Sequence, residues 1–128
     1  MILGTGLDVI EIARIEDSHR RFGDRFLQRI LLPEEIAYCL SFTRPAPHIA
    51  ARFAAKEAIS KAFGTGIGQE LAWHDLEVVR ESSGKPFVRL HGAGPALFAQ
   101  RQAVALHLSL THTATVAAAT AILEGRSS

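Results

Sequence analysis

The sequence predicts an α+β fold in which helices pack on antiparallel strands, within one domain of residues 1–128. Two pairs of strand-like segments follow each other closely, which is typical of antiparallel hairpins. These segments are 76–80 with 87–90, and 104–110 with 114–123. The alanine-rich segment 49–63, which is followed by Gly64, is the clearest helix.

The N-terminal half contains one predicted strand and three predicted helical segments. Alternating residues between Ile2 and Asp8 favour a strand that ends near Asp8. Apolar residues at helical intervals over 10–26 predict a helix that Gly23 ends or bends. Pro33 is typical of a first helical position, although Leu32 before it is a poor N-cap. Residues 43–47 hold two prolines and are expected to form a loop before the helix over 49–63.

The C-terminal half is dominated by strands. Ser82-Ser83-Gly84-Lys85 joins the first hairpin, and Gly94-Pro95 begins a short helix. Residues 104–110 alternate strictly between apolar and polar side chains, so one face of this strand is exposed. Residues 114–123 mix helix-favouring alanine with β-branched residues, and we favour a strand. The tail 125–128 is expected to fray.

The composition excludes several classes of protein. A net charge of +1 gives no reason to expect nucleic acid as a partner. Arginines crowd residues 14–29, which suits either an acidic partner or an exposed, salt-bridged helix face. Cys39 is the only cysteine, so no internal disulfide can form and a reducing, cytoplasmic location is expected. The sequence shows neither a signal peptide nor an apolar run long enough to span a membrane.

The helix over 49–63 carries the residues best suited to chemistry. Phe53, Glu57 and Lys61 share one face because they are four residues apart, and Arg52 and Lys56 lie beside it. Cations next to a hard carboxylate ligand suit a pyrophosphate that is held with Mg²⁺. Spacing alone favours a Glu57–Lys61 surface ion pair over this binding role.

Asp8 is the second candidate carboxylate. An aspartate among apolar residues is costly to bury unless it is paired, hydrogen-bonded or bound to a metal. If Asp8 meets Glu57, a divalent cation would relieve their repulsion; alone, Asp8 is equally well explained as a cap at the strand end. The Gly64-Thr65-Gly66 turn could approach a phosphate, yet it is not a P-loop and also fits a helix cap. His107 and Ser109 share a strand face without the pattern of a hydrolase.

Together these segments resemble the holo-acyl-carrier-protein synthases, the small trimeric branch of the phosphopantetheinyl transferases. The resemblance rests on blocks in family order that span nearly the whole chain. The blocks are 6–15 (GLDVIEIARI), 52–68 (RFAAKEAISKAFGTGIG), 84–86 (GKP) and 107–113 (HLSLTHT). Leu32 departs from the family, which commonly has a small hydroxyl residue there.

The resemblance implies a role for each matching residue. Asp8 and Glu57 match carboxylates that bind Mg²⁺, and Lys61 matches a lysine that neutralises the coenzyme A pyrophosphate; these three form the implied catalytic set. The other implied coenzyme A contacts are Arg52, Lys56, Gly64, Thr65, Gly66, Lys85, Pro86 and His107. Arg14 matches an arginine that meets the acidic helix of acyl carrier protein, and Arg21 and Arg25 are expected helpers.

The resemblance also implies the reaction and the assembly. A carrier-protein serine attacks the β-phosphorus of coenzyme A and 3′,5′-ADP leaves, with Glu57, Glu35 or a metal-held water as the base. The expected assembly is a homotrimer with central strands and active sites between subunits. Three alternatives remain at this point: a noncatalytic nucleotide- or coenzyme A-binding module, an interaction protein whose arginines dock an acidic partner, and a transferase that serves polyketide or peptide synthases.

Overall fold

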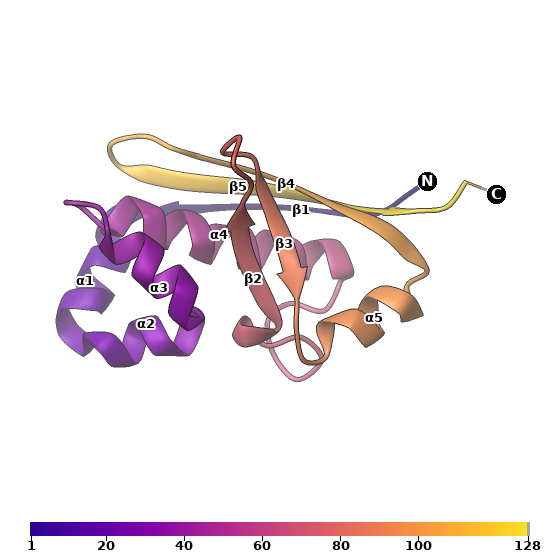
Figure 1. Cartoon of the computed structure of the whole chain (residues 1–128), viewed down its shortest axis with the longest axis horizontal. Helices are drawn as coiled ribbons and strands as arrows, with labels where there is room; N and C mark the ends of the chain where they lie inside the picture. The colour runs from indigo at the N-terminus through magenta and orange to yellow at the C-terminus, as the bar shows by residue number, and fades with distance from the viewer. Residues whose placement is uncertain (128) are drawn as a thin grey trace.

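The computed structural model describes residues 1–127, in which one long antiparallel sheet covers a central helix (Figure 1). The N-terminal elements are β1 (Ile2–Glu11), α1 (Ile12–Phe22), α2 (Asp24–Ile30), α3 (Pro33–Leu40) and α4 (Ala46–Phe63). A short 3-10 helix (Trp73–Asp75) then precedes β2 (Leu76–Arg80), β3 (Pro86–Leu90), α5 (Gly94–Gln100), β4 (Ala103–His112) and β5 (Val116–Gly125). The expected α+β class is confirmed.

The main sheet has the order β1-β5-β4, so the first strand pairs with the last. Because side chains alternate along a strand, this sheet has an inner face toward α4 and an outer face away from it. Buried Ile10 belongs to the inner face, whereas Leu7 and Val9 on the outer face are 58% and 59% exposed. β2 and β3 form a separate hairpin that crosses beside the sheet (Figure 1).

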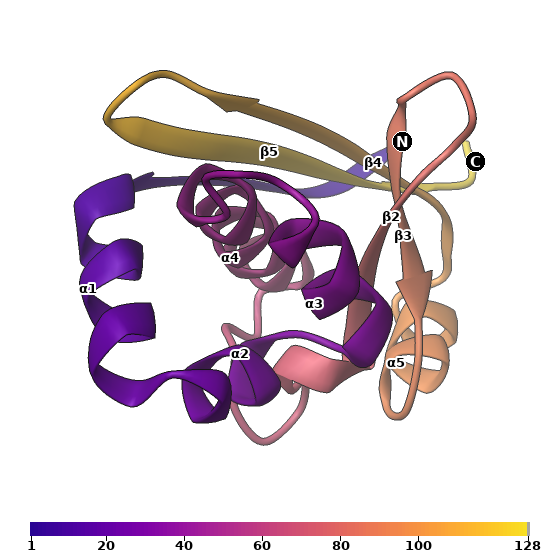
Figure 2. The ribbon, with the colours of Figure 1, turned by 60° about the vertical axis from the view of Figure 1, so that its left-hand side comes forward.

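The central helix α4 lies directly beneath the sheet (Figure 2). Small residues allow this close packing. Ala54 and Ala58 of α4 are fully buried, and so is Ala117 of β5, while Ala119 and Ala121 are 2% and 1% exposed. Helices α1, α2 and α3 and strand β2 surround the rest of α4 (Figure 2). None of the helices in residues 1–127 combines the length and the apolar character that crossing a bilayer requires.

Most element predictions are confirmed, and the differences lie at boundaries. Gly23, with φ of 59°, separates α1 from α2, and α3 begins at Pro33 as expected. The prediction of a loop over 43–47 is wrong at its C-terminal end, because α4 starts at Ala46. Pro47 lies in the first turn, where a backbone N–H has no partner within the helix and is not needed. The prediction that β1 ends near Asp8 is also wrong, since its pairing with β5 continues to Glu11.

The C-terminal strand is confirmed and extends further than expected. Residues 116–125 form β5, so the alanines there serve close packing in a sheet rather than a helix. Gly125 belongs to this strand and not to a frayed tail, because its N–H donates to the Met1 carbonyl at 2.7 Å. Ser128 lies outside the described residues.

Candidate functional site

Asp8 and Lys61 meet where β1 crosses the last turn of α4. The Lys61 ammonium lies 3.3 Å from Asp8 Oδ1 and donates a 2.9 Å hydrogen bond to the Leu7 carbonyl. The Lys61 side chain is 50% exposed, whereas that of Asp8 is 19% exposed. Asp8 is therefore a paired, largely buried carboxylate at the edge of the sheet, as its apolar neighbours in the sequence require.

Glu57 joins this pair from α4, one turn before Lys61. Its pKa is raised above the ordinary value, first because the side chain is partly buried and second because the Asp8 carboxylate is close; Lys61 opposes this shift. The structure thus brings Asp8, Glu57 and Lys61 together, although they are separated by about 50 residues of chain. Two carboxylates that disfavour each other's charge form a site that a cation would stabilise.

The donor set is compatible with Mg²⁺ held together with a phosphate. Within residues 1–127, no group of three or more His, Cys, Asp or Glu side chains gathers that could hold a metal by itself. Mg²⁺ is commonly held by one or two carboxylates, with substrate phosphates and water completing its shell. Asp8 and Glu57 match this mode, and the Lys61 ammonium supplies the positive charge beside Asp8 in this structure.

The glycine-bearing loop after α4 acts as a helix cap. Gly64 has φ of 80°, the left-handed conformation that ends helices. The N–H groups of Gly64, Thr65 and Gly66 donate to the carbonyls of Ser60 and Lys61 at 3.0–3.2 Å. These amides already have acceptors, so the helix-cap explanation is confirmed.

Lys56 differs from its expected role as a coenzyme A contact. Its side chain is completely buried on the side of α4 that faces away from β1. The ammonium donates to Ile30 O at 2.7 Å, Glu35 Oε1 at 2.8 Å and Trp73 O at 3.2 Å. Glu35 also accepts from the N–H groups of Leu32 and Val78 at 2.9 and 3.0 Å. This network joins α2, α3, α4 and β2, so Lys56 stabilises the fold.

The same network corrects the place of Glu35, one of the candidate bases. Glu35 is 2% exposed, and its carboxylate accepts a hydrogen bond from Lys56 on the side of α4 opposite Asp8. The bond from the Leu32 N–H also explains how α3 begins without a capping side chain at Leu32. The spacing of 21 residues between Glu35 and Lys56 gives no local signal, so the sequence did not reveal this pair.

Arg52 lies on the same side of α4 as Lys56 and is only 2% exposed. Its guanidinium stacks 4.2 Å from the centroid of the Tyr38 ring and faces a cavity of about 260 Å³. Two of its nitrogens, Nε and Nη1, have no hydrogen-bond partner. A buried guanidinium in this state is a strong candidate for an anionic ligand or a bound water.

A group of histidines and aromatic rings adjoins Arg52, and sequence patterns did not single it out. His48 stacks on Phe42 with centroids 3.6 Å apart, and His112 lies 5.6 Å from His48. Burial lowers the pKa of His48, and nearby His112 and Arg52 lower it further. This environment favours the neutral form of His48. The sequence did not reveal the cluster because its members are far apart along the chain.

The remaining expected coenzyme A contacts come from elements other than β1 and α4. His107 is on the outer face of β4, where its Nε2 is 2.8 Å from Glu124 Oε1. Lys85 is exposed in the turn between β2 and β3, and Pro86 begins β3. Among the described residues, no hydrogen bond or ion pair joins these three residues to Asp8, although the family resemblance placed them in one site.

The expected carrier-protein contacts lie on α1 and α2. Arg14, Arg21 and Arg25 are all exposed. The Arg21 guanidinium lies 3.8 Å from Asp17 and 5.3 Å from the Phe22 ring centroid. Arg25 lines a cavity of about 370 Å³ with Phe22, Phe26 and Arg29. These helices present cations and aromatic rings on one surface.

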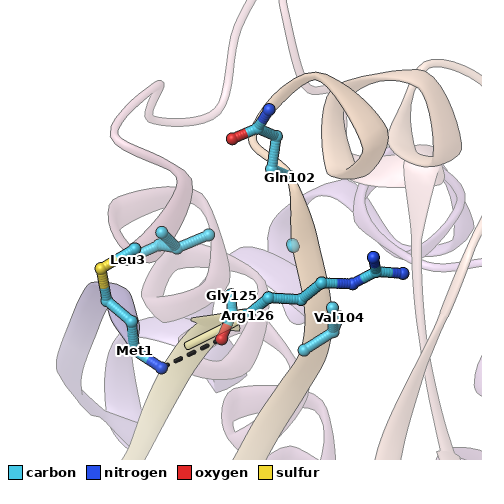
Figure 3. Close-up of a pocket in the computed structure, with 7 residues that line it drawn as sticks. Met1, Leu3, Gln102, Val104, Gly125 and Arg126 are labelled. Atoms are coloured by element: carbon cyan, nitrogen blue, oxygen red, sulfur yellow. Dashed lines mark hydrogen bonds between the residues drawn. The ribbon is translucent and has the colours of Figure 1, made fainter. Parts of the chain in front are cut away.

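Another cavity, of about 400 Å³, opens at the end of the sheet where the termini meet (Figure 3). The Met1 ammonium donates to the Gly125 carbonyl at 3.0 Å there, and Arg126 extends along its wall. Among residues 1–127, no carboxylate side chain lines this cavity. Met1 is seven residues from Asp8 on the same chain segment, roughly 23 Å along a strand, so the two places are separate.

Comparisons with known proteins agree on one family. The model of the 4′-phosphopantetheinyl transferase superfamily matches residues 4–121. A holo-[acyl-carrier-protein] synthase of Koribacter versatilis is 49% identical over 97% of this chain and 99% of the relative, and one from Geobacter is 45% identical over the same shares.

Solved structures give the same result. The holo-[acyl-carrier-protein] synthase of Neisseria meningitidis superposes with a TM-score of 0.91 at 31% identity, covering 97% of this chain and 99% of that one. The Helicobacter pylori synthase in complex with coenzyme A superposes with a TM-score of 0.84 at 34% identity, covering 94% and 99%.

Proposed function

Since this chain belongs to the 4′-phosphopantetheinyl transferase superfamily and, within it, to the holo-[acyl-carrier-protein] synthases, we propose that it moves 4′-phosphopantetheine from coenzyme A to a serine of apo-acyl carrier protein in a Mg²⁺-dependent reaction. The observation that carries the proposal is the meeting of Asp8, Glu57 and Lys61. Coenzyme A as the donor is supported by related synthases whose structures contain it.

The reaction is a phosphoryl transfer. The serine Oγ forms a bond to the β-phosphorus of coenzyme A, the bond from that phosphorus to the bridging oxygen breaks, and 3′,5′-ADP leaves with the electron pair. Asp8 and Glu57 would hold Mg²⁺, which when bound offsets charge on the phosphate oxygens. Lys61 of α4 adds a positive charge, and its hydrogen bond to the Leu7 carbonyl of β1 holds that charge in place.

The serine proton needs an acceptor close to the reacting phosphorus. Glu35 does not serve, because it is bound to Lys56 on the other side of α4. Glu57 and a metal-held water remain, and the raised pKa of Glu57 favours it as a proton acceptor. Positioning of the substrates supplies much of the remaining rate acceleration.

The nucleotide is proposed to bind between neighbouring subunits of a homotrimer. In one chain, Arg52 and His107 lie away from Asp8, and each faces a different side of the molecule. The outer sheet face, with exposed Leu7, Val9 and Ile122, offers an apolar surface for another copy. Arg52, Lys85, Pro86 and His107 of one subunit would then complete the site at the loop Gly64-Thr65-Gly66 of another.

The acyl carrier protein is proposed to dock on α1 and α2 through Arg14, Arg21 and Arg25. Exposed arginines are suited to an acidic helix, and the adjacent Phe22 and Phe26 add apolar contact. The whole chain, residues 1–128, acts as one transferase domain in this proposal. A cytoplasmic location is proposed as well, which fits the free, buried Cys39.

The test is to mix the protein with apo-acyl carrier protein, coenzyme A and Mg²⁺ and to weigh the carrier protein by mass spectrometry. The carrier protein should gain one phosphopantetheine, and chelation of the metal should prevent the gain. Asp8→Ala and Glu57→Ala should abolish transfer, whereas Glu11→Ala, which removes an exposed carboxylate of the same strand, should not. Full Mg²⁺-dependent transfer by Asp8→Ala would exclude the proposed metal site, and coenzyme A binding without any mass gain would indicate a noncatalytic module.

A further inference from the structure

Strand β1 lies against the backbone of α4 at two glycines, Gly4 and Gly6. We propose that Gly6 is a positioning residue, which sets the separation at which Asp8 of β1 and Glu57 of α4 can share one divalent cation. The inference rests on the proposed function and concerns how the metal site is held together rather than which residues ligate the metal.

The evidence is the lack of space beside Gly6. A Cβ atom at Gly6 would lie 1.7 Å from the carbonyl oxygen of Ala58, and one at Gly4 would lie 2.0 Å from that of Ala62. Both obstacles are helix backbone, which cannot rotate away as a side chain can. Neither glycine has a positive φ, so the conformation of the strand does not require glycine. Close approach of the strand to the helix is the reason for glycine at both positions.

The contact at Gly6 lies between the two halves of the site. Gly6 and Asp8 are two residues apart and therefore point to the same face of the sheet. Ala58, which Gly6 touches, directly follows Glu57 in the helix. The hydrogen bond from Lys61 to the Leu7 carbonyl, between Gly6 and Asp8, ties the same two segments together. The strand–helix spacing at Gly6 thus determines the spacing of the carboxylates.

The size of the effect follows from the distances. Since Cβ contacts under 3.0 Å essentially never occur, alanine at position 6 requires the strand and helix to separate by about 1.3 Å, the difference between 3.0 and 1.7 Å. Metal–ligand distances tolerate deviations of only about 0.2 Å. Ala58 is fully buried, so the helix has no free space into which it could move away from the strand. Gly6→Ala should therefore loosen metal binding even in protein that stays folded.

The experiment is a Mn²⁺ titration of the full-length protein with saturating coenzyme A, followed by water-proton relaxation, alongside coenzyme A binding without metal. We expect Gly6→Ala to weaken Mn²⁺ binding by at least about tenfold, the range found when supporting residues of metal sites are changed. Metal-free coenzyme A binding should change less than about twofold. Gly68→Ala is the matched control, because nothing lies within 4 Å of its added Cβ.

A rescue variant separates positioning from general destabilisation. Asp8→Glu lengthens the side chain by one methylene, about 1.5 Å of reach. It should weaken Mn²⁺ binding in the natural background and strengthen it in the Gly6→Ala background. A purely structural role for Gly6 gives Asp8→Glu the same effect in both backgrounds and overturns the proposal. If Gly6→Ala does not fold, Gly4→Ala carries the test, with a smaller expected loss because its contact is longer and lies farther from Asp8.

The outcomes also separate this inference from the proposed function. Unchanged Mn²⁺ binding in Gly6→Ala, together with its loss in Asp8→Ala, refutes the positioning role and leaves the metal site intact. Unchanged Mn²⁺ binding in both variants refutes the metal site and with it both proposals.

Discussion

Replacing Lys56 by methionine is the most informative single perturbation, because the position has two competing roles. Methionine keeps most of the volume and removes the ammonium, which is fully buried and bonded to three oxygens. Glu35 would keep its two backbone donors and lose its counter-charge. Removal of one partner of a buried pair leaves an uncompensated charge and costs about 3–5 kcal/mol.

That cost is a large share of the roughly 5–15 kcal/mol that separates folded from unfolded domains. For a domain of this size it lowers Tm by roughly 10–20 °C. Burial lowers the pKa of Lys56 in spite of the neighbouring Glu35, so desolvation outweighs the pairing. Lys56→Met/Glu35→Gln should therefore recover much of the loss, because neither side chain then carries a charge.

The assay is urea and thermal unfolding at a fixed protein concentration, since association with other copies shifts apparent stability. Lys61→Met is the matched control: it lies on the same helix, its side chain is 50% exposed, and its removal should cost less than that of the fully buried Lys56. At a temperature where Lys56→Met is folded, its KM for coenzyme A should be unchanged. A loss below about 1 kcal/mol together with a raised KM would refute the structural role and restore Lys56 as a nucleotide contact.

Three further predictions concern the site, the assembly and the partner. Because the pKa of Glu57 is raised, the folded state binds the proton of the Glu57 carboxyl more tightly than the unfolded chain does. This proton binding stabilises the fold at low pH, and the stabilisation is lost as pH rises through the folded-state pKa. Glu57→Gln should thus raise the Tm of the metal-free protein at pH 7, with the difference from wild type vanishing below about pH 4; a lower Tm at pH 7 would contradict this. Val9→Lys, on the outer sheet face, should convert the proposed homotrimer of about 42 kDa (3 × 13.9 kDa) into monomers on sedimentation, and an unchanged mass would show that other copies do not cover this face. Arg14→Glu should raise KM for acyl carrier protein by about tenfold while KM for coenzyme A stays the same, whereas equal effects would argue against docking at α1.

Local patterns predicted the elements well, because their causes are local. The break at Gly23 and the start of α3 at Pro33 depend on backbone preferences that single residues reveal. The exposed face of β4 followed from strict alternation. The predicted end of β1 was wrong because the strand stops where its pairing with residues 116–125 stops, and these residues lie more than 100 positions away in the sequence.

The site could be predicted only in part. Asp8, Glu57 and Lys61 were singled out as chemically unusual, and the structure brings them together. The buried network around Lys56 was not predicted, because helical spacing tells which face a residue lies on and not what packs against that face. The Glu35–Lys56 pair and the ring cluster at His48 join residues from different elements, and no period in the sequence encodes such pairings.

Strand β1 pairs with β5 alone among the described strands, and this pairing imposes an order on maturation. During synthesis, Asp8 emerges early, but its strand has no hydrogen-bonding partner until residues 116–125 have followed. Contacts between such distant segments close slowly because the intervening chain must first be ordered. In a nascent chain, α4 with Glu57 and Lys61 can therefore form before β1 has its partner, and the proposed cation site is completed only after residues 116–125 have been synthesised.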